Sequence, residues 1–376
     1  MEHPKLIVSA VGLTEGGPLS ILLDLAAHLH PVFDPADVVY LIHGSIAPQF
    51  EGKQFETYSW PKASWAKRLY FEKMYVKRIE RRLEPKLWIS LHDITASLDR
   101  TPQLVYCHNP SPFYDRRIAL PVFDLKFQLF TAFYEQLYSW GIHANQYVIV
   151  QQNWMRDEFV KRFGLSKDRV TVAHPVPPEH LKTANRSDQP HVLRIPSAER
   201  PLRLIYPAFP RVLKNIEFIG ELARALVGEP VQFEITIDGN ENEYARFLRE
   251  KYGNVSTLCF IGRQPRVKLL ELYRSVDALI FPSRQETWGL PLSEFMETGR
   301  PILAADMPYA HEVLSGYAMA DLFALSNIRP ATQKIRALLR GEFTPRPISV
   351  DIPEPLCADW SSMVHWLTRL THQHST

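Results

Sequence analysis

Two glutamates, Glu286 and Glu294, are separated by seven residues on a segment whose pattern predicts a strand, a loop and a helix. Residues 278–282 are apolar and predict the strand. Pro291 suits the first turn of the helix because its missing N–H would be unpaired there anyway, and Gly299 is a common residue type just past a helix end. One carboxylate is therefore expected on the loop after a strand and the other on the first turns of a helix.

The start of this predicted helix has the chemistry to hold a diphosphate. Its unpaired N–H groups and partial positive charge favour anions. Gly289 lacks a side chain and lets a ligand approach the backbone, while Glu294 can accept hydrogen bonds from a ribose diol. We therefore predict that this segment binds a molecule with a diphosphate and a ribose, and that the neighbouring residues Thr287, Trp288 and Leu290 belong to the same site.

This segment resembles the signature of the retaining glycosyltransferases of the family 4, group 1 type, which include bacterial mannosyl-, glucosyl- and rhamnosyltransferases. Here the signature is Glu286-Thr-Trp-Gly-Leu-Pro-Leu-Ser-Glu294-Phe-Met-Glu-Thr-Gly-Arg-Pro-Ile302. The second half of the chain matches well, and the first half matches in layout and in a few loops. The resemblance implies a GT-B fold, a nucleotide-sugar donor such as a GDP- or UDP-sugar, retained anomeric configuration, and no required metal or cofactor.

Arg211 and Lys214 follow the first predicted strand of the second half. The family places an Arg and a Lys here to hold the donor diphosphate. Such cations stabilise the charge that builds on a leaving diphosphate; Arg grips phosphate with two parallel bonds, and Lys acts as a point charge. Many relatives have Gly before the Arg and a longer spacing to the Lys, whereas here Pro210 precedes Arg211 and two residues separate the cations.

The resemblance also implies a mechanism, because no side chain clearly fills the role of a covalent nucleophile. The acceptor attacks the face from which the diphosphate leaves, and the leaving phosphate serves as base. Arg211, Lys214 and the helix start at Leu290 would stabilise the departing diphosphate. Glu286 would hold hydroxyls of the donor sugar, and Glu294 would hold the ribose.

Two glycine-containing loops complete the predicted donor site. Gly16 and Gly17 follow the first predicted strand and open a helix, where backbone N–H groups could reach an anionic donor. The pattern Gly-x-Gly-x-x-Gly of dinucleotide-binding proteins is absent. In relatives a Gly-Gly loop at this place faces the donor, and the nucleotide base lies near the position of Gly262 and Arg263.

Histidines at predicted strand ends are the candidates for the acceptor side. Relatives often carry a His in the region of His108, near the transferred sugar, so His108 is predicted to contact a sugar hydroxyl or to place the acceptor. A packed core histidine is the alternative. Asn109 is its polar neighbour, and His92 would either line the acceptor side or belong to a turn. The 14 histidines form no convincing His-x3-His pair on a helix, and we predict no metal site.

Short apolar runs alternate with longer amphipathic stretches, which is typical of parallel sheets with crossover helices. Strands are predicted at residues 6–12, 38–44, 87–91, 104–108, 147–151, 170–173, 202–208, 233–238, 257–262, 278–282 and 302–305. Helices are predicted at residues 18–30, 64–83, 122–140, 153–163, 215–227, 241–251, 266–276, 291–298, 328–339 and 361–370. The expected class is α/β, with two Rossmann-like domains whose parallel sheets face a central cleft.

A break in this alternation sets the predicted domains. Residues 174–200 are rich in Pro and polar residues. We predict an acceptor-side domain at 1–180, a linker at 181–200 and a nucleotide-sugar-binding domain at 201–357. A C-terminal helix in 358–376 is expected to return to the first domain.

Composition excludes several classes of protein. With 43 Lys and Arg against 41 Asp and Glu, the net charge of +2 does not favour nucleic acid as a partner. The 3 cysteines lie far apart and form no Cys-x-x-Cys pair, so buried free thiols in a reducing compartment are expected. No apolar run reaches about 18 residues, and the expected location is the cytoplasm, with peripheral contact at the inner membrane face as an open possibility.

Residues 62–82 could provide that contact. They hold eight basic residues and two acidic ones, with apolar residues at roughly helical spacing. A basic amphipathic helix can lie on an anionic membrane, which would bring the protein to a lipid-linked acceptor. The alternative is an ordinary solvated basic face.

The predicted function is transfer of a sugar from a nucleotide-sugar donor to a saccharide or lipid-linked saccharide, in bacterial surface polysaccharide or glycolipid synthesis. A nucleotide-sugar epimerase of the same fold is an alternative, although it would need no acceptor. A sugar phosphorylase would usually need a lysine-bound pyridoxal phosphate, and no such lysine context is visible. A non-catalytic sugar-binding or scaffold protein is the remaining alternative.

Overall fold

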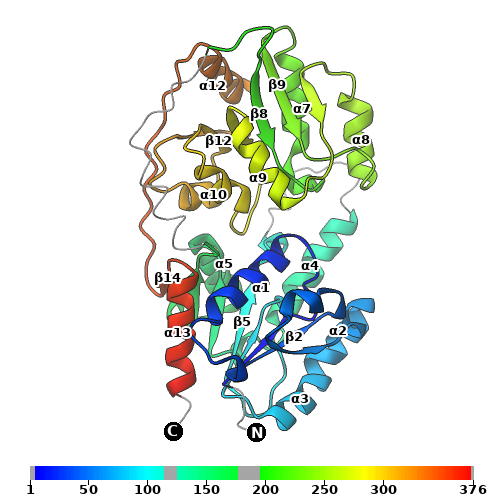
Figure 1. Cartoon of the computed structure of the whole chain (residues 1–376), viewed down its shortest axis with the longest axis vertical. Helices are drawn as coiled ribbons and strands as arrows, with labels where there is room; N and C mark the ends of the chain where they lie inside the picture. The colour runs from blue at the N-terminus through cyan, green and yellow to red at the C-terminus, as the bar shows by residue number, and fades with distance from the viewer. Residues whose placement is uncertain (1–4, 114–124, 177–194, 374–376) are drawn as a thin grey trace. The chain divides into compact units, whose positions relative to one another are not determined.

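The computed structural model describes residues 5–113, 125–176 and 195–373, with side chains omitted at 125–130 and 132. These residues fall into two compact units, each built on its own parallel sheet (Figure 1). Residues 5–113, 128–176 and 352–373 form the first unit, and residues 195–351 form the second. Most of the predicted linker, 181–200, lies outside the described residues.

The first unit contains an eight-stranded sheet in the order β14-β7-β6-β5-β4-β1-β2-β3, with every described pairing parallel. Its strands are β1 (Leu6–Ser9), β2 (Val38–Ile42), β3 (Gln54–Thr57), β4 (Leu87–Ser90), β5 (Gln103–Cys107), β6 (Tyr147–Val150), β7 (Val170–Ala173) and β14 (Leu356–Cys357). The sequence missed β3 because this edge strand is polar and half exposed, and it missed β14 because two residues form no apolar run.

The second unit contains a six-stranded parallel sheet in the order β10-β9-β8-β11-β12-β13. Its strands are β8 (Leu202–Tyr206), β9 (Val231–Ile235), β10 (Leu258–Phe260), β11 (Ala278–Phe281), β12 (Ile302–Ala305) and β13 (Ala320–Phe323). The strands are almost entirely buried, as expected for sheets covered by helices on both faces. The α/β class with two parallel sheets is confirmed.

Helices connect the strands of each sheet. In the first unit they are α1 (Gly16–Leu29), α2 (Trp65–Tyr70), α3 (Val76–Leu83), α4 (Leu125–Ser139), α5 (Asn153–Phe163) and α13 (Trp360–Gln373). In the second they are α7 (Ile216–Ala225), α8 (Glu243–Tyr252), α9 (Arg266–Ser275), α10 (Leu290–Met296), α11 (Pro308–Val313) and α12 (Arg329–Leu339). None of the helices in the described ranges is both long and apolar enough to cross a bilayer.

The single helix predicted at 64–83 is wrong in one respect, because a π-helical turn at Phe71–Tyr75 separates α2 from α3. Such turns hold one extra residue and are frequent at functional sites. The extra residue keeps Phe71 and Val76 buried in the same core, together with the carboxylate-bearing side chain of Glu72. The apolar spacing alone could not reveal this change of helical register.

The C-terminal helix α13 belongs to the core of the first unit. It packs against α1, and its buried residues Trp360, Met363 and Leu367 share one apolar cluster with Leu22 and Leu25. The last described turns of the chain therefore stabilise the layer that carries the loop after β1.

In the second unit, α7 and α8 pack through a glycine. A Cβ built on Gly220 would lie 2.6 Å from Cγ of Tyr252, so the ring rests directly on the helix backbone. The Tyr252 hydroxyl also donates to Oε1 of Glu221 at 2.7 Å. This contact fixes α7, which directly follows the loop that carries Arg211 and Lys214.

We expect Gly220→Ala to destabilise the protein by about 1–3 kcal/mol, because the added methyl overlaps the Tyr252 ring. Urea unfolding would measure the change. On an exposed helix face the same substitution would instead stabilise, by about 1 kcal/mol. The double variant Gly220→Ala/Tyr252→Leu should recover part of the loss relative to the two single variants, and strictly additive losses would contradict the packing contact.

Candidate functional site

Two loops of the second unit are joined at the carboxyl ends of neighbouring strands β8 and β11. The backbone N–H of Arg284 donates to the carbonyl of Leu213 at 2.8 Å, and the Asn215 amide donates to the carbonyl of Pro282 at 3.2 Å. Asn215 is buried and has a positive φ of 54°, a conformation that asparagine tolerates better than most residues. The two loops therefore hold each other in place.

These loops bring Lys214 and Glu286 together. Lys214 Nζ donates to Glu286 Oε1 at 2.5 Å, and the two side chains are 24% and 11% exposed. Nearby, the Tyr309 hydroxyl donates to the Ser283 carbonyl at 2.8 Å. Burial, and then the Glu286 carboxylate, raise the pKa values of Tyr206 and Tyr309 well above their usual range, so both phenols stay neutral donors.

Arg211 lies on the same loop as Lys214 but is exposed. Its Cζ lies 5.8 Å from the centre of the Phe209 ring, which is itself 51% exposed. Within the described part of the chain, no carboxylate lies within ion-pair distance of Arg211. Its guanidinium is therefore available to an external anion, beside a cation that already holds Glu286.

Gly289 begins α10 with a positive φ of 86°, which explains why a glycine stands here. A Cβ at this position would also lie 3.3 Å from Cδ1 of Leu292. Thr287 and Leu290 are partly buried on either side. Trp288 is buried, and its indole Nε1 donates to Ser293 Oγ at 3.2 Å, so this side chain supports the loop from beneath.

Glu294 lies on α10 beside α9. Its Oε1 is 3.3 Å from Arg266 Nη2, and burial followed by this carboxylate raises the pKa of Tyr273 well above its usual range. The carboxylate is thus mostly enclosed and held by a cation. Gly262, with a φ of 71°, and exposed Arg263 lie after β10, on a different loop of the same unit.

In the first unit, Gly16 starts α1 with a positive φ of 68°, and Gly17 follows in its first turn. The structure therefore places both predicted glycines at the start of α1, directly after the loop that follows β1. His92 and His108 follow β4 and β5, which are neighbours in the same sheet.

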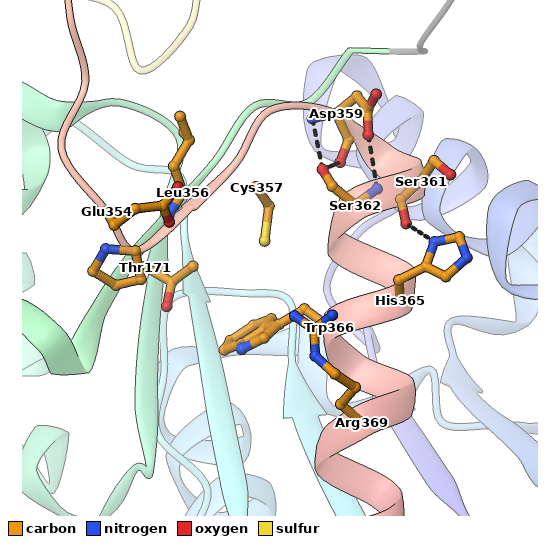
Figure 2. Close-up of a pocket in the computed structure, with 11 residues that line it drawn as sticks. Thr171, Glu354, Leu356, Cys357, Asp359, Ser361, Ser362, His365, Trp366 and Arg369 are labelled. Atoms are coloured by element: carbon orange, nitrogen blue, oxygen red, sulfur yellow. Dashed lines mark hydrogen bonds between the residues drawn. The ribbon is translucent and has the colours of Figure 1, made fainter.

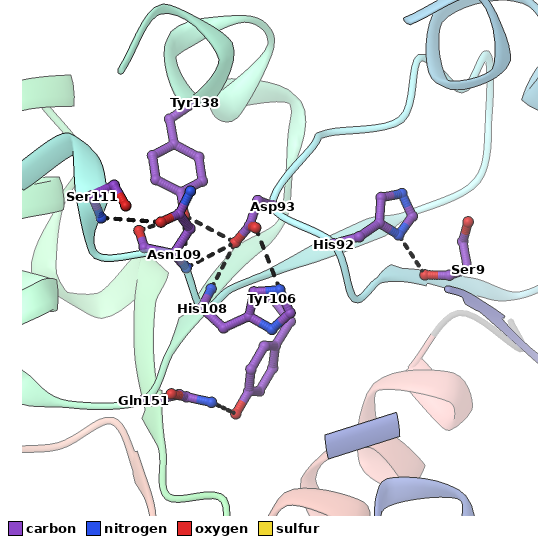
Figure 3. Close-up of polar contacts among 9 residues, drawn as sticks. All are labelled: Ser9, His92, Asp93, Tyr106, His108, Asn109, Ser111, Tyr138 and Gln151. Carbon is purple, nitrogen blue, oxygen red and sulfur yellow. Dashed lines mark hydrogen bonds and ion pairs between the residues drawn. The ribbon is translucent and has the colours of Figure 1, made fainter. Parts of the chain in front are cut away.

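Asp93 organises the region around His108 (Figure 3). Its Oδ1 accepts from the backbone N–H of His108 at 2.7 Å and from the Tyr138 hydroxyl at 2.9 Å, and its Oδ2 lies 3.4 Å from His108 Nε2. Burial alone would raise the pKa of Asp93, but the charge of His108 and these hydrogen bonds outweigh it and hold that pKa below its usual value. The Asn109 backbone N–H donates to the same carboxylate at 3.2 Å.

The other nitrogen of His108 points to a role in binding. His108 Nδ1 is enclosed and has no hydrogen-bond partner within the described ranges. A buried polar atom in this state loses the bonds it would make to water, so a ligand or a bound water is expected to satisfy it.

His92 differs from His108 because both of its ring nitrogens are engaged. Nδ1 lies 2.8 Å from the Ser9 carbonyl, and Nε2 lies 2.7 Å from Glu72 Oε1. Burial, and then the charge of Arg68, lower the pKa of His92, while the Glu72 carboxylate acts in the opposite direction. Arg68 Nε lies 3.3 Å from the same Glu72 oxygen.

The sequence did not single out Arg68, Glu72 or Asp93. Arg68 and Glu72 stand four residues apart, which was a usable signal for a helical ion pair, but they were hidden in a stretch of many charges. Asp93 has a positive φ of 69°, and the residues around it in the sequence do not predict this backbone conformation.

One hollow of the first unit lies away from these residues (Figure 2). It has a volume of about 510 Å³ and is lined by β14 and α13 residues that include Cys357, Ser362 and His365. None of the predicted site residues lines it. Burial, and then Glu354, raise the pKa of Cys357 to about 12, so this thiol is not a reactive one.

No group of three or more His, Cys, Asp and Glu side chains in the described ranges has the arrangement of a metal site. The cations Arg211 and Lys214 offer the charge that a diphosphate needs in the second unit.

Comparison with known proteins supports this picture. Residues 195–349 match the family described as Glycosyl transferases group 1, and a search of curated protein sequences gave no match. The solved structure of the lipopolysaccharide outer core galactosyltransferase WaaB is 13% identical with a TM-score of 0.62, over 98% of this chain and 97% of WaaB.

Two further solved structures are similar over nearly the whole chain. HepE from Anabaena in complex with UDP-glucose is 13% identical with a TM-score of 0.62, over 99% of this chain and 98% of HepE. WaaG, a glycosyltransferase involved in lipopolysaccharide biosynthesis, is 15% identical with a TM-score of 0.63, over 99% of this chain and 95% of WaaG. Through residues 195–349 the chain is similar to the group 1 glycosyltransferases, and its fold is GT-B.

Proposed function

We propose that the protein is a retaining glycosyltransferase that moves a sugar from a nucleotide-sugar to a saccharide or lipid-linked saccharide. The observation that carries this proposal is the Lys214–Glu286 ion pair of 2.5 Å beside exposed Arg211, at the carboxyl edge of the second sheet. Ligands of open α/β sheets bind at this edge.

The second unit supplies the donor contacts in this proposal. Arg211 and Lys214 neutralise the diphosphate without a metal, Glu294 accepts from the ribose hydroxyls, and Glu286 holds hydroxyls of the sugar. Because Lys214 already touches Glu286, one short contact would couple the position of the sugar to that of its leaving group. The complex of HepE with UDP-glucose makes UDP the first nucleotide to test.

The proposed reaction breaks the bond between the anomeric carbon and the β-phosphate oxygen and forms a bond from that carbon to the acceptor oxygen. The acceptor's proton passes to the leaving phosphate, and the nucleoside diphosphate is released. Cations that stabilise such a departing diphosphate act mainly in the transition state. No covalent enzyme intermediate is involved.

The first unit supplies the acceptor side in this proposal. Among the described residues His108 Nδ1 has no hydrogen-bond partner, and Asp93 holds the ring through Nε2, so Nδ1 can receive a sugar hydroxyl. The names of WaaB and WaaG connect this fold to lipopolysaccharide, which favours an acceptor in bacterial surface polysaccharide or glycolipid synthesis.

An epimerase or a sugar-binding scaffold would form no new glycosidic bond, so analysis of the reaction products separates these alternatives from a glycosyltransferase.

We expect UDP to stabilise the protein against heat without magnesium, by about 2.7 kcal/mol at a hundredfold excess over its dissociation constant. Lys214→Met and Glu294→Ala should each weaken UDP binding about tenfold or more, because each removes a charged contact. Lys268→Met is the matched control, since Lys268 is an exposed lysine on neighbouring α9.

Titration with UDP, GDP, ADP and dTDP by calorimetry would assign the base. If none of them binds, the protein is not a nucleotide-sugar enzyme, and the scaffold alternative gains support.

The Asp93 carboxylate predicts a specific dependence on pH. Its folded-state pKa is depressed, so its contribution to stability is present above the unfolded value of about 3.9 and is lost as the pH falls through the folded value. Asp93→Asn should therefore be less stable than the wild type at pH 7, by about 1–3 kcal/mol. The difference should shrink below about pH 4.

Urea unfolding at several pH values would show this convergence, and parallel stability curves would contradict it. The same variant should alter the pH profile of donor turnover, because Asp93 positions His108. Glu51→Gln, at an exposed carboxylate, is the control.

We also propose peripheral membrane contact through residues 62–82. In α2 and the following π turn, Trp65, Tyr70 and Met74 are exposed by 43%, 47% and 59%, with exposed Lys67 among them. On α3, by contrast, Lys77 and Arg81 pair with Asp99, and Arg82 pairs with Glu56. The surface suited to an anionic membrane is therefore the α2 end of this segment.

We expect the protein to bind phosphatidylglycerol vesicles more tightly than phosphatidylcholine vesicles at low salt, measured by sedimentation. Trp65→Ser/Met74→Ser should weaken this binding several-fold through lost apolar contact. Val267→Ser removes an apolar side chain of the second unit that is even more exposed, at 73%, and should have no effect. Equal binding to both lipids would contradict this membrane contact. It would support the alternative in which residues 62–82 form an ordinary solvated basic face.

A further inference from the structure

Arg68 is a buried arginine whose outer nitrogens have no hydrogen-bond partner among the described residues. Its side chain is 9% exposed, and in the described part of the chain its guanidinium forms one ion pair, from Nε to Glu72 at 3.3 Å. Neither Nη nitrogen is sealed from solvent. Arginine offers paired N–H donors that match a phosphate, so a guanidinium held in this way is ready to accept one.

Gly12, on the loop after β1, forms the surface against which this guanidinium lies. A Cβ built on Gly12 would lie 2.8 Å from Nη1, 3.1 Å from Nη2 and 3.2 Å from Cζ of Arg68. Both Nη nitrogens lie nearer to this position than Cζ does, so the outer edge of the guanidinium is turned toward the glycine. The absence of a side chain at residue 12 thus creates the place that Arg68 occupies.

A second cation reaches the same loop. Lys62 Nζ donates to the Thr14 hydroxyl, and Thr14 follows Gly12 by two residues. Two cations from one segment, residues 62–68, therefore converge on the loop between β1 and α1.

Glu72 contacts both Arg68 and His92, so its negative charge offsets the charge of Arg68. Burial, and then the charge of Arg68, lower the pKa of His92, so this ring adds no positive charge at neutral pH. Lys62 is therefore the cation at this loop whose charge an incoming anion would neutralise.

We propose that Arg68, with Lys62 and the backbone at Gly12, forms a binding site for a phosphate group of a substrate. This inference rests on the proposed function and adds a substrate feature to it. The phosphate belongs to a phosphorylated acceptor. Asp93 contributes to the electrostatic environment of Arg68 and also holds His108, so the site adjoins the proposed acceptor side.

The test observes Arg68 directly in the full-length protein. In NMR spectra of arginine-labelled protein, the Nε–H resonance of Arg68 is identified as the one that is absent from the spectrum of Arg68→Met. Inorganic phosphate, titrated at constant ionic strength against chloride, should shift this resonance in a saturable way. Lys67→Met, one residue away and exposed, should keep the wild-type response.

Gly12→Ala provides a gentler variant, since Gly12 does not have a positive φ and the added methyl would displace only the end of the Arg68 side chain. It should weaken the phosphate response about tenfold or more, as expected for a displaced charged contact. It also keeps the test valid if Arg68→Met fails to fold. An Arg68 resonance indifferent to phosphate, or wild-type phosphate affinity in Gly12→Ala, would overturn the proposal.

UDP identifies the source of the phosphate. If inorganic phosphate moves the Arg68 resonance and UDP does not, the site takes a phosphorylated acceptor; an equal response to UDP would overturn the assignment to an acceptor. The affinity of Glu294→Ala for UDP reports separately on the donor site. Failure of that site would leave the phosphate response of Arg68 intact, so the two proposals fail independently.

Discussion

The Lys214–Glu286 ion pair depends on a constraint that governs both units: charged side chains at the ends of buried parallel strands need a partner. Parallel strands deliver their loops to one edge, where burial penalises an isolated carboxylate. In the second unit Lys214 provides the partner for Glu286 at 2.5 Å. In the first unit Arg68 and His92 provide it for Glu72, which is fully buried.

The partners are placed by the backbone as much as by the side chains. Asn215 and Asp93 both have a positive φ, and each joins two loops through hydrogen bonds from or to its side chain. Gly12 and Gly289 give the room that a side chain would fill. A rigid backbone keeps charged groups oriented before a ligand arrives, which is the condition under which electrostatic stabilisation is most effective.

The sequence predicted the second unit better than the first for a physical reason. Glu286, Gly289 and Glu294 lie in one short segment whose strand, loop and helix follow from local apolar pattern and turn residues. Lys214 and Glu286 meet because their strands are neighbours, which the family resemblance implied. Arg68, Glu72 and His92 meet through a π turn and a sheet pairing that no local pattern specifies.

The edge strand β3 was missed because it is polar and half exposed, and the strand β13 and the helix α11 were missed as well. Trp288 shows a different limit: its position in the motif was right, but its indole is buried and bonded to Ser293, where it supports the loop. A motif therefore identifies which loop binds, whereas side-chain packing decides which members of that loop face the ligand. The same reasoning separates His92, whose two nitrogens are both engaged, from His108, whose Nδ1 still lacks a partner among the described residues.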